Sequence, residues 1–213
     1  MASRVDVPIE GATTGREYGV TYNPRVHDEP PPVRTVRRDT VYESARFAVV
    51  RDYQQLPDGS VGTWESIRPR GEIVLVLPIN AAGCVYLVDI FRPLLDCFSL
   101  EVIGGGVEAG EAPELAAARE LLEETGIRGE LIALGTHELS TAMFPIRQHL
   151  FLAHVETIGE PEPEPFERHT IRGLCRLPLA DAVDLVLHGE ILGLSSVSLI
   201  LRANEHLRRE GGG

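Results

Sequence analysis

Hydrophobic and polar positions form short runs along most of the chain, and the period of the pattern changes several times. Residues 36–67 contain strand-forming runs, and Asp58-Gly59 supplies a turn between two of them. Residues 72–79 and 84–91 are nearly continuous apolar runs, which is typical of strands buried on both faces. A further strand begins near Phe98, and we expect it to break at the three glycines that follow Ile103.

Helices alternate with strands in the second half of the chain. One helix starts near Pro113, and Gly126 stands where its C-terminal cap belongs. We expect strands at 130–139 and 147–156, and a strand followed by a helix at 174–191. A closing helix with serine caps is expected at 195–209. Residues 160–168 are acidic and broken by prolines, so we expect an exposed, mobile loop there. The pattern predicts a mixed α/β (α+β) domain.

The N-terminal part of the chain differs in composition from the rest. Residues 1–34 lack apolar periodicity and contain a run of prolines, which predicts a flexible arm. Residues 35–70 form an N-terminal β segment, and residues 71–209 hold the remaining strands and helices as one domain. The β segment has little sequence with which to cover both of its faces, so we expect it to pack against a second copy of the chain.

Charge and residue usage exclude several classes of function. The net charge of −12 argues against binding to nucleic acid, because few cations could replace the counterions of the phosphates. All 20 basic side chains are arginines, so lysine Schiff-base chemistry and a phosphate-binding loop with the GxxxxGK[ST] pattern are excluded. The three cysteines are widely spaced, which is expected of unpaired thiols in a protein of a reducing compartment. Since no apolar segment has the length of a signal core or membrane span, we expect a cytoplasmic protein without a membrane partner.

Residues 105–127 hold six glutamates and one arginine in a stretch rich in glycine and alanine. Glu120 and Glu124 are four residues apart and therefore share one face of the predicted helix, where their repulsion costs stability unless a cation offsets it. Carboxylate and carbonyl oxygens are the donors that Mg²⁺ prefers. A solvated surface helix is the alternative, but it would be expected to carry several arginine partners, and Arg119 stands alone.

The helix also carries an apolar stripe beside the carboxylate face. Leu115, Ala118 and Leu122 recur at helical spacing, and we expect this stripe to pack against the sheet.

The same stretch resembles a complete Nudix box: glycine, five residues, glutamate, seven residues, and then Arg-Glu-apolar-any-Glu-Glu-any-Gly-apolar. The matching positions here are Gly105, Glu111, Arg119, Glu120, Leu121, Glu123, Glu124, Gly126 and Ile127. The resemblance implies a Nudix-type α/β/α sandwich and metal-dependent hydrolysis of a nucleoside diphosphate linked to another moiety. It also implies that Glu120 and Glu124 bind Mg²⁺, or alternatively Mn²⁺.

The resemblance assigns supporting roles to other residues of the box. Glu123 is a metal ligand or assists the catalytic base, and Glu111 supports the metal shell. The carbonyl of Gly104 completes the ligand set, and Arg119 orients a neighbouring carboxylate.

Similarity beyond the box, from about Thr35 to His206, points to the ADP-ribose pyrophosphatase group. Arg92 matches an arginine that contacts substrate phosphate in that group, and the resemblance also assigns substrate binding to Glu101, which begins the segment that leads into the glycines. The N-terminal β segment would form an intertwined homodimer, with Arg68 or Arg70 near the partner's site, where these arginines would bind substrate. The implied reaction cleaves ADP-ribose or a related ADP-sugar to AMP and a sugar phosphate.

One loop departs from the pattern of that group. The group has a Ser-Pro-Gly loop followed by an acidic residue, whereas residues 140–146 read STAMFPI and contain no acid. The base could therefore be Glu123, Glu138 or Glu167. Two other functions stay open: hydrolysis of another nucleoside diphosphate sugar such as GDP-mannose, or of a specialised metabolite's diphosphate, and a weakly active module that binds its ligand.

Overall fold

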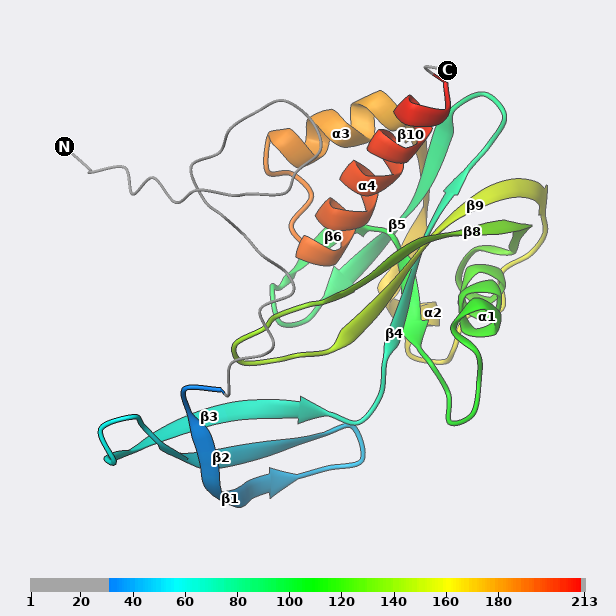
Figure 1. Cartoon of the computed structure of the whole chain (residues 1–213). Helices are drawn as coiled ribbons and strands as arrows, with labels where there is room; N and C mark the ends of the chain where they lie inside the picture. Colours follow the sequence, from blue (N-terminus) through cyan, green and yellow to red (C-terminus); the bar gives the residue numbers. More distant parts are fainter. Residues whose placement is uncertain (1–30, 212–213) are drawn as a thin grey trace. The chain divides into compact units, whose positions relative to one another are not determined.

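Figure 1 shows the computed structural model, which describes residues 31–211. Most of the expected arm at 1–34 therefore lies outside the described residues. The described residues divide into two compact units: one combines residues 31–38 with Asp52–Trp64, and the other combines Asp39–Arg51 with residues 65–211. The expected domain bounds, 35–70 and 71–209, stay predictions.

The N-terminal β segment is a three-stranded sheet in the order β1-β2-β3. Its strands are β1 (Arg34–Glu43), β2 (Phe47–Gln55) and β3 (Val61–Pro69). The predicted turn between the last two is confirmed: Gly59 has a φ of +86°, and the amide of Leu56 donates to the carbonyl of Ser60 at 2.9 Å. Such a φ favours glycine, which has no Cβ to clash with the preceding carbonyl.

The second unit is built on a seven-stranded mixed sheet. The central order is β10-β5-β4-β9-β8, with β6 paired to β5 and β7 paired to β4. The strands are β4 (Ile73–Ile79), β5 (Cys84–Arg92), β6 (Cys97–Glu101), β7 (Ile103–Gly106), β8 (Ile127–Glu138), β9 (Arg147–Ile158) and β10 (Ile171–Pro178). β4 and β9 are parallel, whereas the other neighbouring strands of this sheet pair antiparallel.

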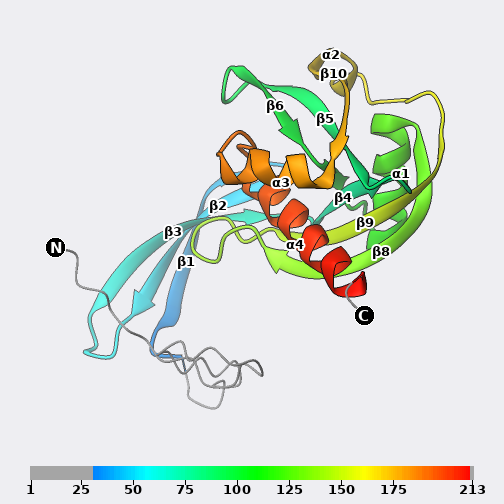
Figure 2. The same ribbon diagram turned by 90° about the horizontal axis from the view of Figure 1, so that it is seen from above.

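Helices cover both faces of this sheet, as Figures 1 and 2 show. On one face, α3 (Leu179–Leu187) and α4 (Leu194–Glu210) pack on a core that includes Leu75 and Leu77. On the other face, α1 (Pro113–Thr125) packs on a core that includes Val74 and Val76. Successive residues of β4 thus point to opposite, buried faces, which explains its continuous apolar sequence. The predicted α/β/α sandwich is confirmed.

Two local expectations were wrong. The strand that begins near Phe98 breaks after Glu101, before the glycines, and Gly104, Gly105 and Gly106 belong to the next strand, β7, which pairs with β4. The serines near 195 do not cap α4, whose N-cap residue is Gly193. Instead, Ser196 Oγ accepts a hydrogen bond from the buried amide of Val102 at 3.1 Å, so this hydroxyl satisfies a donor in the sheet region.

The loop expectation at 160–168 holds only in part. Residues 160–166 are mostly exposed, but the short helix α2 (Glu167–Thr170) begins at its end. None of the helices within residues 31–211 is both long and apolar enough to cross a membrane.

Candidate active site

Helix α1 turns a different face to the sheet from the one we predicted. Leu115 of the expected stripe is 65% exposed, Ala118 is exposed and Leu122 is only half-buried. The buried positions are Ala116, Ala117, Glu120, Leu121, Glu124 and Thr125. The prediction was wrong because it weighted the large leucines, whereas the small alanines allow close approach to the sheet. The buried carboxylates also rule out the solvated surface helix.

Gly105 makes room for the carboxylate of Glu120. A Cβ atom on Gly105 would lie 2.0 Å from Glu120 Cδ and 2.1 Å from its Oε1. Since real contacts of a Cβ atom are never that short, any other residue at 105 would displace this carboxylate or the strand. Gly105 pairs with Val74, so β7, itself a strand of the sheet, places its glycine backbone next to the carboxylate of Glu120 on α1.

Three carboxylates converge next to this glycine strand. One oxygen each from Glu120, Glu124 and Glu167 lies within 4.8 Å of the others. Glu120 and Glu124 are only 7% and 8% exposed. Glu167 belongs to α2, far along the chain from α1, and its Oε2 accepts a hydrogen bond from the amide of Glu164 at 3.3 Å. The fold therefore assembles an acidic cluster from two distant segments.

The protonation of this cluster reflects its burial. Burial, together with the charges of the neighbouring Glu167 and Glu120, raises the pKa of Glu124 to about 9, while Arg92 and the amide of Gly104 oppose the shift. Burial also raises the pKa of Glu120, and the hydrogen bond from Arg119 only partly offsets it. Buried oxygen donors that repel one another fit a hard divalent cation, whose charge would remove the repulsion.

Arg119 is the hub of a second group of carboxylates. It donates to both oxygens of Glu111 at 3.0 Å, to Glu120 at 2.7 Å, to Glu123 at 3.3 Å and to the carbonyl of Gly106 at 2.9 Å. Glu111 and Glu123 thus lie against the guanidinium rather than in the three-carboxylate cluster. The hydrogen bonds from Arg119, and one from the amide of Glu108, lower the pKa of Glu111.

Arg92 and Glu101 form a bidentate ion pair beside the cluster. Two nitrogens of Arg92 donate to the two oxygens of Glu101 at 2.9 and 2.6 Å. This hydrogen-bonded pairing raises the pKa of Arg92, and the charges of Glu124 and Glu167 contribute in the same direction. The two predicted substrate-binding residues are therefore brought together, next to the predicted metal ligands.

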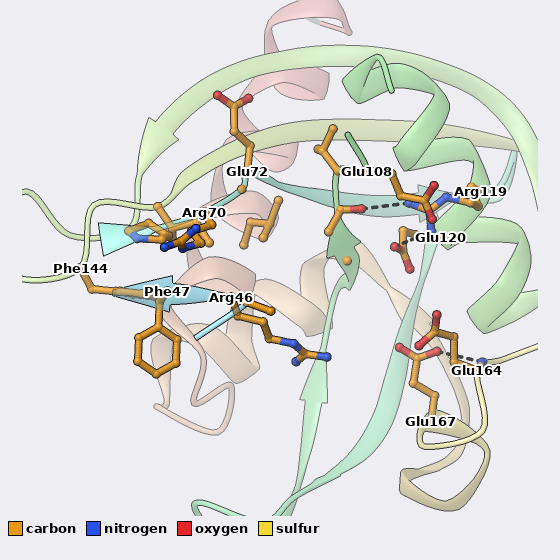
Figure 3. Close-up of a pocket in the computed structure, with 18 residues that line it drawn as sticks. Arg46, Phe47, Arg70, Glu72, Glu108, Arg119, Glu120, Phe144, Glu164 and Glu167 are labelled. Atoms are coloured by element: carbon orange, nitrogen blue, oxygen red, sulfur yellow. Dashed lines mark hydrogen bonds and ion pairs between the residues drawn. The ribbon is translucent and has the colours of Figure 1, made fainter. Parts of the chain in front are cut away.

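A cavity of about 650 Å³ opens beside the cluster and is shown in Figure 3. Its acidic side holds Glu108, Glu120, Glu164 and Glu167, and its other side holds Arg46, Phe47, Arg70 and Phe144. Arg70, a predicted substrate-binding residue, lines the cavity and is ion-paired with Glu43. Arg68 lies on β3 and is exposed, and it does not line the cavity.

Sequence reasoning did not single out Arg46, Phe144 or Glu164. Arg46 follows a turn with no motif of its own, so no signal marked it. Phe144 lies in the one loop that departs from the expected pattern, and that departure was a usable signal.

The loop at 140–146 contributes apolar surface in place of an acid. Phe144 and Ile146 line the cavity, and the carbonyl of Met143 accepts a hydrogen bond from the amide of Ile67 at 2.8 Å. Of the acids that we considered as the base, Glu138 pairs with Arg147 at 3.3 Å and does not line the cavity. Glu167 lines the cavity and also belongs to the acidic cluster.

Comparison with known proteins gives consistent matches. The family model for the NUDIX domain matches residues 69–192. The chain is 40% identical over 85 residues to the ADP-sugar pyrophosphatase of Mus musculus, a match that covers 35% of this chain and 39% of that protein. The chain therefore spans only about two fifths of the length of that relative.

Two bacterial relatives match over a longer range. Identity is 27% over 159 residues to the ADP-ribose pyrophosphatase of Bacillus subtilis, covering 74% of this chain and 85% of that protein. Identity is 29% over 173 residues to the ADP-ribose pyrophosphatase of Mycobacterium tuberculosis, covering 78% and 81%. A crystal structure of an ADP compounds hydrolase shares the fold, with a TM-score of 0.74 and 24% identity over 84% of this chain and 96% of that chain.

Proposed function

The chain belongs to the NUDIX family, and we propose that it hydrolyses the pyrophosphate bond of a nucleoside diphosphate sugar. ADP-ribose or a related ADP-sugar is the favoured substrate, and AMP and a sugar phosphate are the products. The observation that carries this proposal is the cluster of the buried Glu120 and Glu124 with the half-buried Glu167, beside the Arg92–Glu101 pair. It combines a cation site with an arginine suited to phosphate oxygens.

Glu120 and Glu124 would hold Mg²⁺, with Mn²⁺ as the alternative, and the carbonyl of Gly104 is our proposed further ligand. When bound, the cation supplies charge neutralisation at the pyrophosphate and a lowered pKa for a bound water. Arg119 fixes the orientation of Glu120 through its 2.7 Å hydrogen bond. Glu111 and Glu123 act through Arg119, because both accept hydrogen bonds from its guanidinium.

Glu167 is our proposed general base. It faces the cavity next to Glu120 and Glu124, and the amide of Glu164 holds its side chain. A base must lie within hydrogen-bond reach of the proton that it accepts, and Glu138, which does not line the cavity, is poorly placed for this. In this assignment Glu167 accepts the proton of the water that attacks phosphorus.

Another nucleoside diphosphate sugar, such as GDP-mannose, is the second candidate. The observation that favours it is the loop at 140–146, which carries Phe144 and Ile146 into the cavity and no acid. Apolar side chains discriminate weakly between substrates that differ by polar groups, so we expect low selectivity for the sugar or the nucleobase of the substrate.

The test is turnover of a panel of ADP-ribose, ADP-glucose and GDP-mannose with Mg²⁺, with an EDTA control. We expect release of a nucleoside monophosphate and a sugar phosphate, with the highest kcat/KM for ADP-ribose. Binding of these compounds without turnover would identify a ligand-binding module. Release of phosphate from nucleoside triphosphates, with every nucleotide sugar left intact, would refute the proposal.

We also propose that the protein acts as a homodimer in the cytoplasm. What supports the dimer is the N-terminal sheet, in which Val41, Tyr42, Val61 and Trp64 are each about half exposed. Apolar surface of this kind is commonly covered by another subunit.

A further inference from the structure

Arg46 occupies a defined position in the cavity of the candidate active site. It lies in the turn between β1 and β2, and Ser44 Oγ accepts hydrogen bonds from its amide and from that of Phe47, at 3.3 and 3.2 Å. Its carbonyl accepts a hydrogen bond from the amide of Arg70 at 3.0 Å. The backbone of Arg46 is therefore held in place, and Figure 3 shows its side chain extending into the cavity.

The arginines that line the cavity differ in their partners. Arg70 is paired with Glu43, and Arg119 is saturated by three glutamates and a carbonyl. Within residues 31–211, the guanidinium of Arg46 has neither an ion pair nor a hydrogen bond. Among the described residues that line the cavity, Arg46 thus offers the guanidinium that is available to an anion.

Carboxylates on the acidic side of the same cavity do not neutralise Arg46. Glu120, Glu164 and Glu167 line that side, yet none of them lies within ion-pair distance of Arg46 in the described residues. A pyrophosphate diester has negatively charged oxygens on both phosphates, and a cation held by the glutamates would contact only part of them. A guanidinium on the opposite side matches the remaining oxygens, because its planar fork pairs with phosphate bidentately.

We propose that Arg46 binds phosphate oxygens of the substrate across the cavity from the acidic cluster. The inference rests on the proposed function and adds a substrate-binding residue to it. Arg46 acts on binding rather than on the chemical step, because its guanidinium neither carries nor removes a proton at neutral pH. Its loss should therefore raise KM more than it lowers kcat.

Binding of imidodiphosphate, a pyrophosphate analogue with a non-hydrolysable bridge, tests this inference without requiring turnover. Calorimetry at saturating Mg²⁺ would compare the wild type with Arg46→Gln, Arg46→Lys and Arg128→Gln. Arg128 is an exposed arginine of β8 that does not line this cavity, so it controls for loss of general positive charge. Removing a charge-assisted hydrogen bond of this kind is expected to weaken binding by about tenfold to a hundredfold.

We expect that loss in Arg46→Gln, a smaller loss in Arg46→Lys, which keeps the charge but not the fork, and an unchanged Kd in Arg128→Gln. The shift of the melting temperature by Mg²⁺ should be the same in all four proteins, because Arg46 is not part of the acidic cluster.

Two results would overturn the inference. One is an Arg46→Gln protein that binds imidodiphosphate as tightly as the wild type, and the other is a wild type that does not bind it at all. Failure of the proposed function has a different signature, since imidodiphosphate would still bind through Arg46 while every nucleotide sugar stays intact.

Discussion

Glu124→Gln should make the metal-free protein more stable. The pKa of Glu124 is raised to about 9 by burial and by neighbouring carboxylates, whereas its ordinary value is 4.5. Between these two values the unfolded chain has released the proton and the folded chain has kept it, so stability falls as pH rises. At pH 7.5, which lies about three pH units above the pKa of the unfolded chain, keeping this proton costs the folded state about 4 kcal/mol.

Glutamine cannot ionise in either state and so removes this pH-dependent cost, but it buries an amide, which costs about 1–3 kcal/mol when it lacks partners. The net gain in the free energy of unfolding is therefore about 1–3 kcal/mol. In a chain of this size, each kcal/mol raises Tm by about 2–4 °C. The gain should shrink as the pH is lowered towards 5, where the wild-type carboxyl is protonated in both states for a larger fraction of molecules.

Differential scanning calorimetry with EDTA and with Mg²⁺ measures both halves of this prediction. Mg²⁺ at about a hundredfold excess over its Kd should stabilise the wild type by about 2.7 kcal/mol and should stabilise Glu124→Gln far less. Glu114→Gln is the matched control, because Glu114 is an exposed glutamate on the same helix. A variant that gains no stability in EDTA, or that responds to Mg²⁺ as the wild type does, would refute the reasoning.

Four further predictions test the site, the core and the assembly. Gly105→Ala should lower kcat/KM by about tenfold or more, because the new Cβ displaces the carboxylate of Glu120, and circular dichroism should show an intact fold. Glu167→Gln should lower kcat by about 10²–10⁴ and flatten the acidic limb of the pH–rate profile, and a kcat within about twofold of the wild type would exclude it as the base. Ser196→Ala removes the acceptor of the buried Val102 amide and should cost about 1–3 kcal/mol in urea unfolding, whereas an unchanged midpoint would show that the amide finds another partner. Light scattering at micromolar concentration should give about twice the chain mass, and a monomer would contradict the proposed homodimer.

The sheet and its helices could be predicted because their signals are local and repeated. The apolar runs at 72–79 and 84–91 match β4 and β5, and the helix signals at Pro113 and Gly126 match α1. Gly126 has a φ of +70° and its amide donates to the carbonyl of Leu122 at 2.8 Å, as a glycine C-cap does. Such features depend on a few neighbouring residues, so the sequence contains them directly.

The packing of the site could not be predicted in the same way. Leu115 has the larger apolar surface, but the depth of α1 is set by the small Ala116 and Ala117 against a glycine strand. Hydrophobic periodicity contains no information on how closely two backbones approach each other. The spacing of the glutamates identified Glu120 and Glu124, yet the place of Glu167 beside them depends on the whole path of the chain from α1 to α2.

The most direct test of the central claim is ³¹P NMR of ADP-ribose incubated with Mg²⁺ and the wild-type protein, beside a parallel sample of Glu124→Gln. With the wild type, the two pyrophosphate signals should be replaced by two phosphomonoester signals, from AMP and ribose 5-phosphate, and EDTA should stop the change. Glu124→Gln should leave most of the ADP-ribose intact while remaining folded. Persistence of the pyrophosphate signals with the wild type, or equal conversion by Glu124→Gln, would contradict the account.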